Sequence, residues 1–90
     1  MLKVVQSNQF RKDLKLAKKR GLDLNLLKEV VDKLCAGEQL PPKNRNHKLS
    51  HEYKEFMECH IEPNWLLIYK IQDDNLLLYL FRTGTHSDLF

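Results

Sequence analysis

Residues 57–71 read MECHIEPNWLLIYKI, and this stretch decides the fold. Apolar and polar side chains alternate over residues 57–62, which is the period of a strand with one buried face. Residues 63–64 predict a turn, and residues 65–71 are apolar on both faces except at Lys70. We therefore predict an antiparallel pair whose second strand lies in the middle of a sheet.

The flanking segments extend this pair into a larger sheet. Residues 73–75 predict a tight turn, so residues 75–83 form the third strand of a meander. The β-branched run at residues 2–6 predicts a short opening strand, which can add to either edge. Residues 85–90, which follow a glycine, are expected to form a short tail.

Two helices are predicted between the opening strand and the meander. Ser7 and Asp23 are suitable N-caps, and Gly21 and Gly37 end the helices. Apolar residues recur at helical spacing in both, at Phe10, Leu14 and Ala17 and then at Leu27, Val30, Val31 and Leu34. Residues 38–50 are expected to form a loop. The chain is thus a single α+β domain, residues 1–90, of order β-α-α-β-β-β, with an antiparallel-rich sheet and the helical hairpin packed on one face.

Charge is distributed unevenly along the chain. Residues 1–50 carry 12 Lys and Arg against 5 Asp and Glu, a net +7, whereas residues 51–90 carry 3 against 7, a net −4. This asymmetry favours a cationic surface that holds phosphates, although the same residues could form an ordinary solvated helix face. No segment has the length of a membrane span or the core of a signal peptide, so we expect a cytoplasmic protein whose two cysteines remain buried thiols.

Several kinds of chemistry lack the residues that they need. The histidines and cysteines do not have zinc spacing, because Cys59 and His60 point to opposite faces of a strand. A serine elbow and a glycine-rich phosphate loop are both absent. We therefore expect no metal and no cofactor.

An acid–base set remains. Glu58 and His60 are two residues apart and share the face that the helices leave uncovered, with Arg82 and His86 near the end of the third strand. A carboxylate beside an imidazole stabilises the imidazolium. RNA cleavage needs a base for the 2′-hydroxyl, an acid for the leaving oxygen and a cation for the phosphate. Glu58 and His60 could instead form a simple ion pair on a solvated face.

Aromatic side chains could hold unpaired bases by stacking. Phe90, the last residue, and Phe56, on the uncovered face, are the candidates for this role. The other aromatic residues in the strands are expected to belong to the core, namely Trp65, Tyr69, Tyr79 and Phe81.

Three motifs carry a family resemblance. Residues 60–70 (HIEPNWLLIYK), 82–90 (RTGTHSDLF) and 47–49 (HKL) resemble the YafQ-type toxins of the RelE/ParE superfamily. The order of the amino-terminal strand and the two helices also fits, so the resemblance covers essentially the whole chain.

The resemblance implies a type II toxin that cleaves mRNA in the ribosomal A site and is held inactive by a protein antitoxin. The catalytic positions that match are His47, Glu58, His60 and His86. RNA contacts are assigned to Phe90, Arg82, Lys43, Arg45 and Lys48. His86 is the candidate acid, Glu58 and His60 together supply the base, and His47 could contact phosphate or be an ordinary loop histidine. The family commonly has Asp at the positions of Glu58 and Asn64.

The resemblance also fixes the expected partners and the alternatives. The partners are mRNA, the ribosome and an acidic, partly disordered antitoxin, with no membrane and with DNA reached only through an antitoxin complex. A ParE-like poison of DNA gyrase would not need the acid–base set. A non-catalytic RNA- or ribosome-binding module would use the basic helices alone, and a degenerate relative would bind its antitoxin without cutting.

Overall fold

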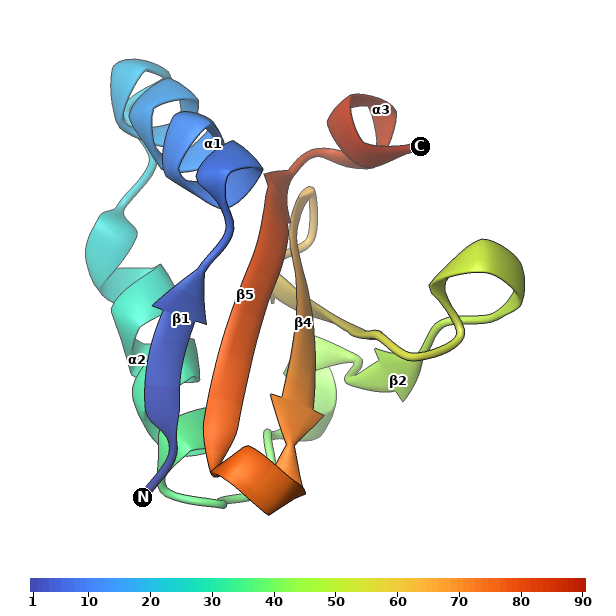
Figure 1. The fold of residues 1–90 in the computed structure, drawn as a ribbon. Helices are drawn as coiled ribbons and strands as arrows, with labels where there is room; N and C mark the ends of the chain where they lie inside the picture. Colours follow the sequence, from blue (N-terminus) through green and yellow to red (C-terminus); the bar gives the residue numbers. More distant parts are fainter.

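The computed structural model describes residues 1–90 and has a five-stranded mixed sheet with helices on both faces. The elements are β1 (Lys3–Gln6), α1 (Asn8–Lys19), α2 (Leu24–Cys35), η1 (Pro42–Asn44), β2 (His47–Lys48), η2 (His51–Tyr53), β3 (Met57–Glu62), β4 (Trp65–Gln72), η3 (Asp73–Asn75), β5 (Leu77–Gly84) and α3 (His86–Leu89). The α+β fold with its amino-terminal helical hairpin is therefore confirmed (Figure 1).

The strand order across the sheet is β1-β5-β4-β3-β2. Strand β1 runs parallel to β5, and the other neighbours are antiparallel, so the opening strand adds to the β5 edge. Strand β4 lies at the centre, as the apolar run predicts, and its residues 65–69 are all buried. The register shifts between His60 and Glu62, and this bulge lies beside the residues of greatest chemical interest.

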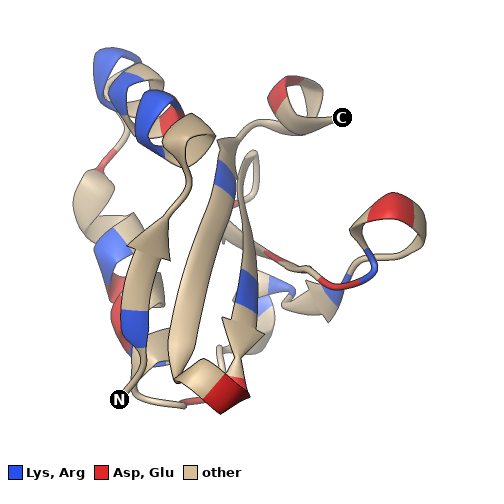
Figure 2. Ribbon diagram, viewed as in Figure 1, with Lys and Arg blue, Asp and Glu red and all other residues tan.

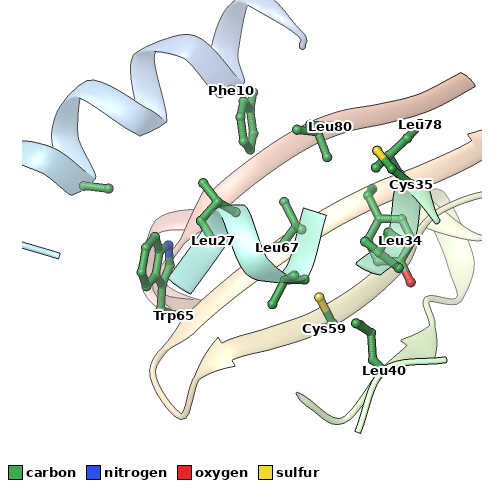
Figure 3. Close-up of a cluster of buried hydrophobic side chains, with 13 residues drawn as sticks. Phe10, Leu27, Leu34, Cys35, Leu40, Cys59, Trp65, Leu67, Leu78 and Leu80 are labelled. Carbon is green, nitrogen blue, oxygen red and sulfur yellow. The ribbon is translucent and has the colours of Figure 1, made fainter. Parts of the chain in front are cut away.

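The two long helices cover one face of the sheet, which we call the helix face. The side chain of Ser7 caps α1, and that of Asp23 caps α2. The core between helices and sheet contains Phe10, Ala17, Leu27, Val30, Leu34, Cys35, Leu40, Cys59, Trp65, Leu67, Tyr69, Leu78 and Leu80 (Figure 3). Cys59 and Leu67 are completely buried there, and the burial of Cys59 confirms the predicted orientation of β3.

The opposite face, which we call the site face, was expected to be uncovered, and that expectation is wrong. A second, smaller cluster of Leu66, Ile68 and Leu89 lies there, packed against Leu49, Phe56 and Phe81. The physical reason is that β4 is apolar on both faces, so its second face also needs cover. Phe81 consequently packs on this face and not in the main core, and Tyr79 is only half-buried.

Two segments are more structured than predicted. The expected loop 38–50 contains η1 and the two-residue strand β2, which pairs with β3. The expected tail 85–90 forms the short helix α3 (Figure 1). Its Leu89 packs on the site face. Both cysteines are buried free thiols. None of the helices is long and apolar enough to cross a membrane.

Candidate active site

A pocket of about 550 Å³ opens on the site face where β3, β4 and α3 meet. Its lining is mostly polar: Glu58, His60, Pro63, Asn64, Leu66, Thr85, His86 and Ser87. Three of the four residues predicted to carry chemistry therefore line one pocket, together with Asn64. The fourth, His47, lies on β2 and contacts the carboxylate of Glu58.

Glu58 lies between two imidazoles. Its Oε1 is 3.3 Å from Nε2 of His47 and 4.0 Å from Nε2 of His60. The Glu58 side chain is only 9% exposed, so the expectation of an open position is wrong for this residue. His47 covers it because β2 pairs with β3 and places residue 47 directly opposite residue 58. The His60 side chain is 19% exposed and that of His47 is 49% exposed, so both rings remain accessible.

Backbone carbonyls fix the tautomer of both rings. Nδ1 of His47 donates to the Arg45 carbonyl at 2.8 Å, and Nδ1 of His60 donates to the Pro63 carbonyl at 3.2 Å. A carbonyl oxygen can only accept, so Nδ1 carries a proton in each ring. In the neutral ring Nε2 therefore has the free lone pair, and in both histidines this nitrogen lies on the side of Glu58.

Two asparagines hold the segment that carries His47, and sequence reasoning missed both. The amide of buried Asn44 donates to the His60 carbonyl at 2.7 Å. The Tyr69 hydroxyl donates to Oδ1 of Asn46 at 2.5 Å. Arg45, between them, has a left-handed backbone with φ of 46°, and it bends the chain into β2. The only sequence signal for this was a run of turn-forming residues after two prolines.

His86 is the first residue of α3. Thr85 caps this helix, and its side chain and that of Asp88 form a reciprocal capping box. The rings of His86 and Phe90 lie 5.0 Å apart, one turn from each other. Phe90 is 52% exposed, so this aromatic residue remains accessible beside the pocket histidine.

Aromatic side chains continue from α3 across the site face. Phe56 and Phe81 stack with ring centroids 4.6 Å apart, and Tyr53 contacts Phe90 edge-on at 6.0 Å. Lys70 lies 5.3 Å above the Phe56 ring. Phe56 is thus engaged with other side chains, which leaves Phe90 as the more available stacking surface. Sequence reasoning missed Tyr53.

Arg82 does not line the pocket. Its Nε and Nη2 donate to the two carboxylate oxygens of Asp13 at 2.8 and 3.3 Å. Asp13 is buried and also accepts the Thr83 backbone N–H, so α1 is tied to the end of β5. These hydrogen bonds raise the pKa of Arg82 above its usual value. The predicted phosphate contact is already an ion pair, with 25% of its side chain exposed.

The cations predicted to contact RNA in the 38–50 segment are all exposed, namely Lys43, Arg45 and Lys48. Figure 2 shows that Lys and Arg also gather along α1. The structure contains no group of three or more His, Cys, Asp or Glu side chains arranged to hold a metal ion.

The fold and pocket define a class: a small α+β protein with a histidine–carboxylate site on the sheet face opposite its helical hairpin. Comparison with known proteins gives the family. The model of the family described as "Bacterial toxin of type II toxin-antitoxin system, YafQ" matches residues 2–90. The chain belongs to this family, as the resemblance of its motifs predicts.

Relatives and solved structures agree with this assignment. The mRNA interferase toxin YafQ of Escherichia coli strain K12 is 44% identical over 85 residues, covering 93% of this chain and 90% of that protein. A metal-bound toxin from Helicobacter pylori has a TM-score of 0.95 at 44% identity, with both chains fully covered. The E. coli DinJ-YafQ complex gives a TM-score of 0.91 at 42% identity, covering 100% of this chain and 99% of that one.

Proposed function

We propose that the pocket is the active site of an endoribonuclease that cleaves mRNA by acid–base catalysis with side chains alone. The observation that carries the proposal is the convergence of His60, His86 and Glu58 on one pocket, from two strand residues and a separate helix. Three such groups at one cavity match what phosphodiester cleavage by an internal 2′-hydroxyl requires.

In the proposed reaction His60 is the base. Its Nε2 takes the proton from the 2′-hydroxyl, and the freed 2′-oxygen attacks the adjacent phosphorus. Glu58 acts through His60 because its carboxylate is buried and faces Nε2 of that ring. His86 is the acid: it gives a proton to the 5′-oxygen as the bond from phosphorus to that oxygen breaks. The products are a 2′,3′-cyclic phosphate and a 5′-hydroxyl end.

Charge on the phosphate is stabilised by the cations around the pocket. His47 is accessible and lies against the same carboxylate as His60, so we assign it a phosphate contact. Lys43, Arg45 and Lys48 extend this contact along the backbone, and Phe90 stacks on a base beside the scissile bond. Arg82 contributes through the N–H groups that Asp13 leaves unused.

The partners in this proposal are the ribosome, with cleavage in its A site, and a cognate antitoxin. The E. coli relative is known in complex with DinJ, which supports an antitoxin partner here. An acidic, partly disordered antitoxin would complement the basic surface of the amino-terminal half and fold against it. Cleavage of mRNA on ribosomes would take place in the cytoplasm.

The test compares wild type with His86→Ala and a matched control, His51→Asn. His51 is exposed, lies outside the pocket and has a left-handed backbone that asparagine tolerates. Each protein, refolded free of antitoxin, is incubated with mRNA with and without ribosomes, and the new 5′ ends are mapped by primer extension.

We expect discrete cuts from wild type and His51→Asn, and none from a folded His86→Ala. The new ends should accept phosphate from a kinase without prior phosphatase treatment, because they carry a 5′-hydroxyl. Absence of cuts from wild type under both conditions would overturn the proposal. DNA gyrase and ribosome-binding assays would then separate the two remaining classes of function.

A further inference from the structure

The helix that carries His86 is too short to hold its own position. Helix α3 has four residues, and a single turn is not stable by itself in water. It must therefore be fixed by contacts with the rest of the molecule. Leu89 supplies one by packing against Leu66 and Ile68. That contact leaves the helix free to rotate about the buried side chain, so a second, directional contact is needed to aim His86.

Asp88 makes this directional contact. Its Oδ2 accepts from Nη1 of Arg20 at 2.7 Å, and its Oδ1 accepts from Nη2 at 3.3 Å. Arg20 is the C-cap residue of α1, 68 positions earlier in the chain. Two parallel hydrogen bonds between a guanidinium and a carboxylate fix orientation as well as distance. The pair also lowers the pKa of Asp88 well below its usual range.

The same carboxylate organises the start of α3. Oδ2 of Asp88 accepts the backbone N–H of Thr85 at 2.9 Å, and Thr85 directly precedes His86 in the chain. The backbone of Gly84 also passes so close that a Cβ there would lie 2.9 Å from Oδ2. One side chain therefore joins the end of α1, the end of β5 and the first turn of α3.

We propose that Arg20 and Asp88 are positioning residues, which latch α3 against α1 and so hold His86 at the pocket. The inference rests on the proposed nuclease function for its activity readout. Neither residue lines the pocket described above, and neither touches the reacting atoms. They act through the orientation of α3.

Two substitutions separate this role from simple electrostatics. Arg20→Met removes a positive charge, whereas Asp88→Asn removes a negative one and keeps an oxygen that can accept the Thr85 N–H. Effects on RNA binding through charge alone would have opposite signs. Loss of the contact between Arg20 and Asp88 should instead reduce the cleavage rate in both variants. Lys28→Met is the matched control, because Lys28 and Asp32 form an exposed ion pair with the same 2.7 Å separation on α2.

The first measurement is single-turnover cleavage of mRNA together with RNA affinity. We expect the cleavage rate at saturation to fall between about 10- and 100-fold in both latch variants, because a displacement of about 1 Å in a catalytic group has effects of this size. Arg20→Lys should recover part of the rate, and Lys28→Met should match wild type. Unchanged saturating rates in both latch variants, or opposite changes confined to affinity, would overturn the inference.

The second measurement does not depend on activity. Hydrogen exchange of the backbone amides of residues 86–90 is followed by NMR, with the amides of β4 as an internal reference for global folding. We expect faster exchange at 86–90 in Arg20→Met and Asp88→Asn, with β4 unchanged. If wild type does not cut RNA, the proposed function fails and this measurement still decides the latch. Unchanged exchange at 86–90 would then refute it.

Discussion

The two faces of the central sheet bury very different amounts of apolar side chain. The helix face has a cluster of thirteen buried residues, whereas the site face has three. Twelve-residue helices cover the first, and a four-residue helix and a short irregular segment cover the second. Most of the hydrophobic stabilisation therefore comes from the face that takes no part in the proposed chemistry.

This difference explains how the site can be both ordered and open. Its residues come from β3, from the two-residue strand β2 and from the one-turn helix α3, and polar contacts hold the last two. Short elements with few apolar contacts open locally at a lower free energy than the core does. The large core on the helix face keeps the sheet folded when they open. Stability and catalysis can then be altered separately.

The sharpest test of this separation uses two neighbours on β4 that face opposite ways. Leu67 is completely buried on the helix face, and Leu66 is 2% exposed on the site face. We expect Leu67→Ala to reduce the free energy of unfolding by about 4 kcal/mol, and Leu66→Ala by about 2 kcal/mol, because the thin cover can relax into the space. Urea titration measures both. Equal losses would show that the two faces contribute equally.

The next comparison concerns the ion pair of Asp13 and Arg82, which joins α1 to the end of β5. Arg82→Met should lower the free energy of unfolding by about 2 kcal/mol, because it leaves the buried carboxylate of Asp13 without its cation. Asp13→Asn keeps an acceptor for the Thr83 N–H and frees the guanidinium.

The two variants also test the phosphate contact of Arg82. If Arg82 contacts phosphate, folded Asp13→Asn should bind and cleave RNA at least as well as wild type, and Arg82→Met should bind it less tightly. Filter binding at two salt concentrations and the cleavage assay provide the measurements. Equal impairment in both variants would assign Arg82 a structural role only.

The sequence predicted the sheet and the hairpin well because their signals are local and periodic. Alternation over residues 57–62 and the apolar run 65–71 fix which side chains face the core, and capped helical repeats fix α1 and α2. Strand β2 was not predicted, because two residues form a strand only through their pairing with β3. Helix α3 was not predicted either, because four residues are too few to show a helical period.

The candidate site was predictable in composition but not in its arrangement. His60, His86 and Glu58 do share one pocket. The alternation places Glu58 on the correct face, but its burial depends on His47, which lies opposite it only because β2 pairs with β3. The pairing of Arg82 with Asp13, 69 residues away, has no local signature. The roles of these residues in cleavage stay predictions.

The faces should also respond differently to pH. Burial raises the pKa of Cys59 from 9.0 to about 12 and that of Tyr69 from 10.0 to about 12. Their contribution to stability is complete below pH 9 and is lost as the pH rises toward 12, because the unfolded chain ionises first. Each group accounts for up to about 1.4 kcal/mol per pH unit over its range. On the site face, the hydrogen bonds from Arg20 lower the pKa of Asp88, so its contribution is present above pH 3.8 and is lost as the pH falls.

Urea titrations from pH 7 to 10.5 check the alkaline arm, with Cys59→Ala as the comparison. The free energy of unfolding of the variant should fall less steeply with pH than that of wild type. Above pH 9.5 the difference between the two slopes should correspond to about one proton. On the acid side, the amides of residues 86–90 should lose protection as the pH falls below about 3.8, before those of β4 do, once the intrinsic pH dependence of exchange is corrected for. A slope that Cys59→Ala leaves unchanged would show that this thiol does not ionise on unfolding in that range.

The smallest expected effect lies where the two faces are joined. Tyr69 belongs to the main core, but its hydroxyl reaches Asn46 and so holds the segment that carries His47. Tyr69→Phe keeps the ring in place and should lower the free energy of unfolding by only about 1 kcal/mol, the usual net value of one hydrogen bond. Cleavage should fall severalfold, because His47 loses one of the contacts that place it against Glu58. Tyr79→Phe, in a half-buried residue of β5, is the control and should behave as wild type.

NMR of the imidazole resonances can follow the change directly. A shift confined to His47, with the resonances of His60 and His86 unchanged, would show that the core holds one histidine independently of the other two. Simultaneous shifts of all three would mean instead that the site face moves as one unit.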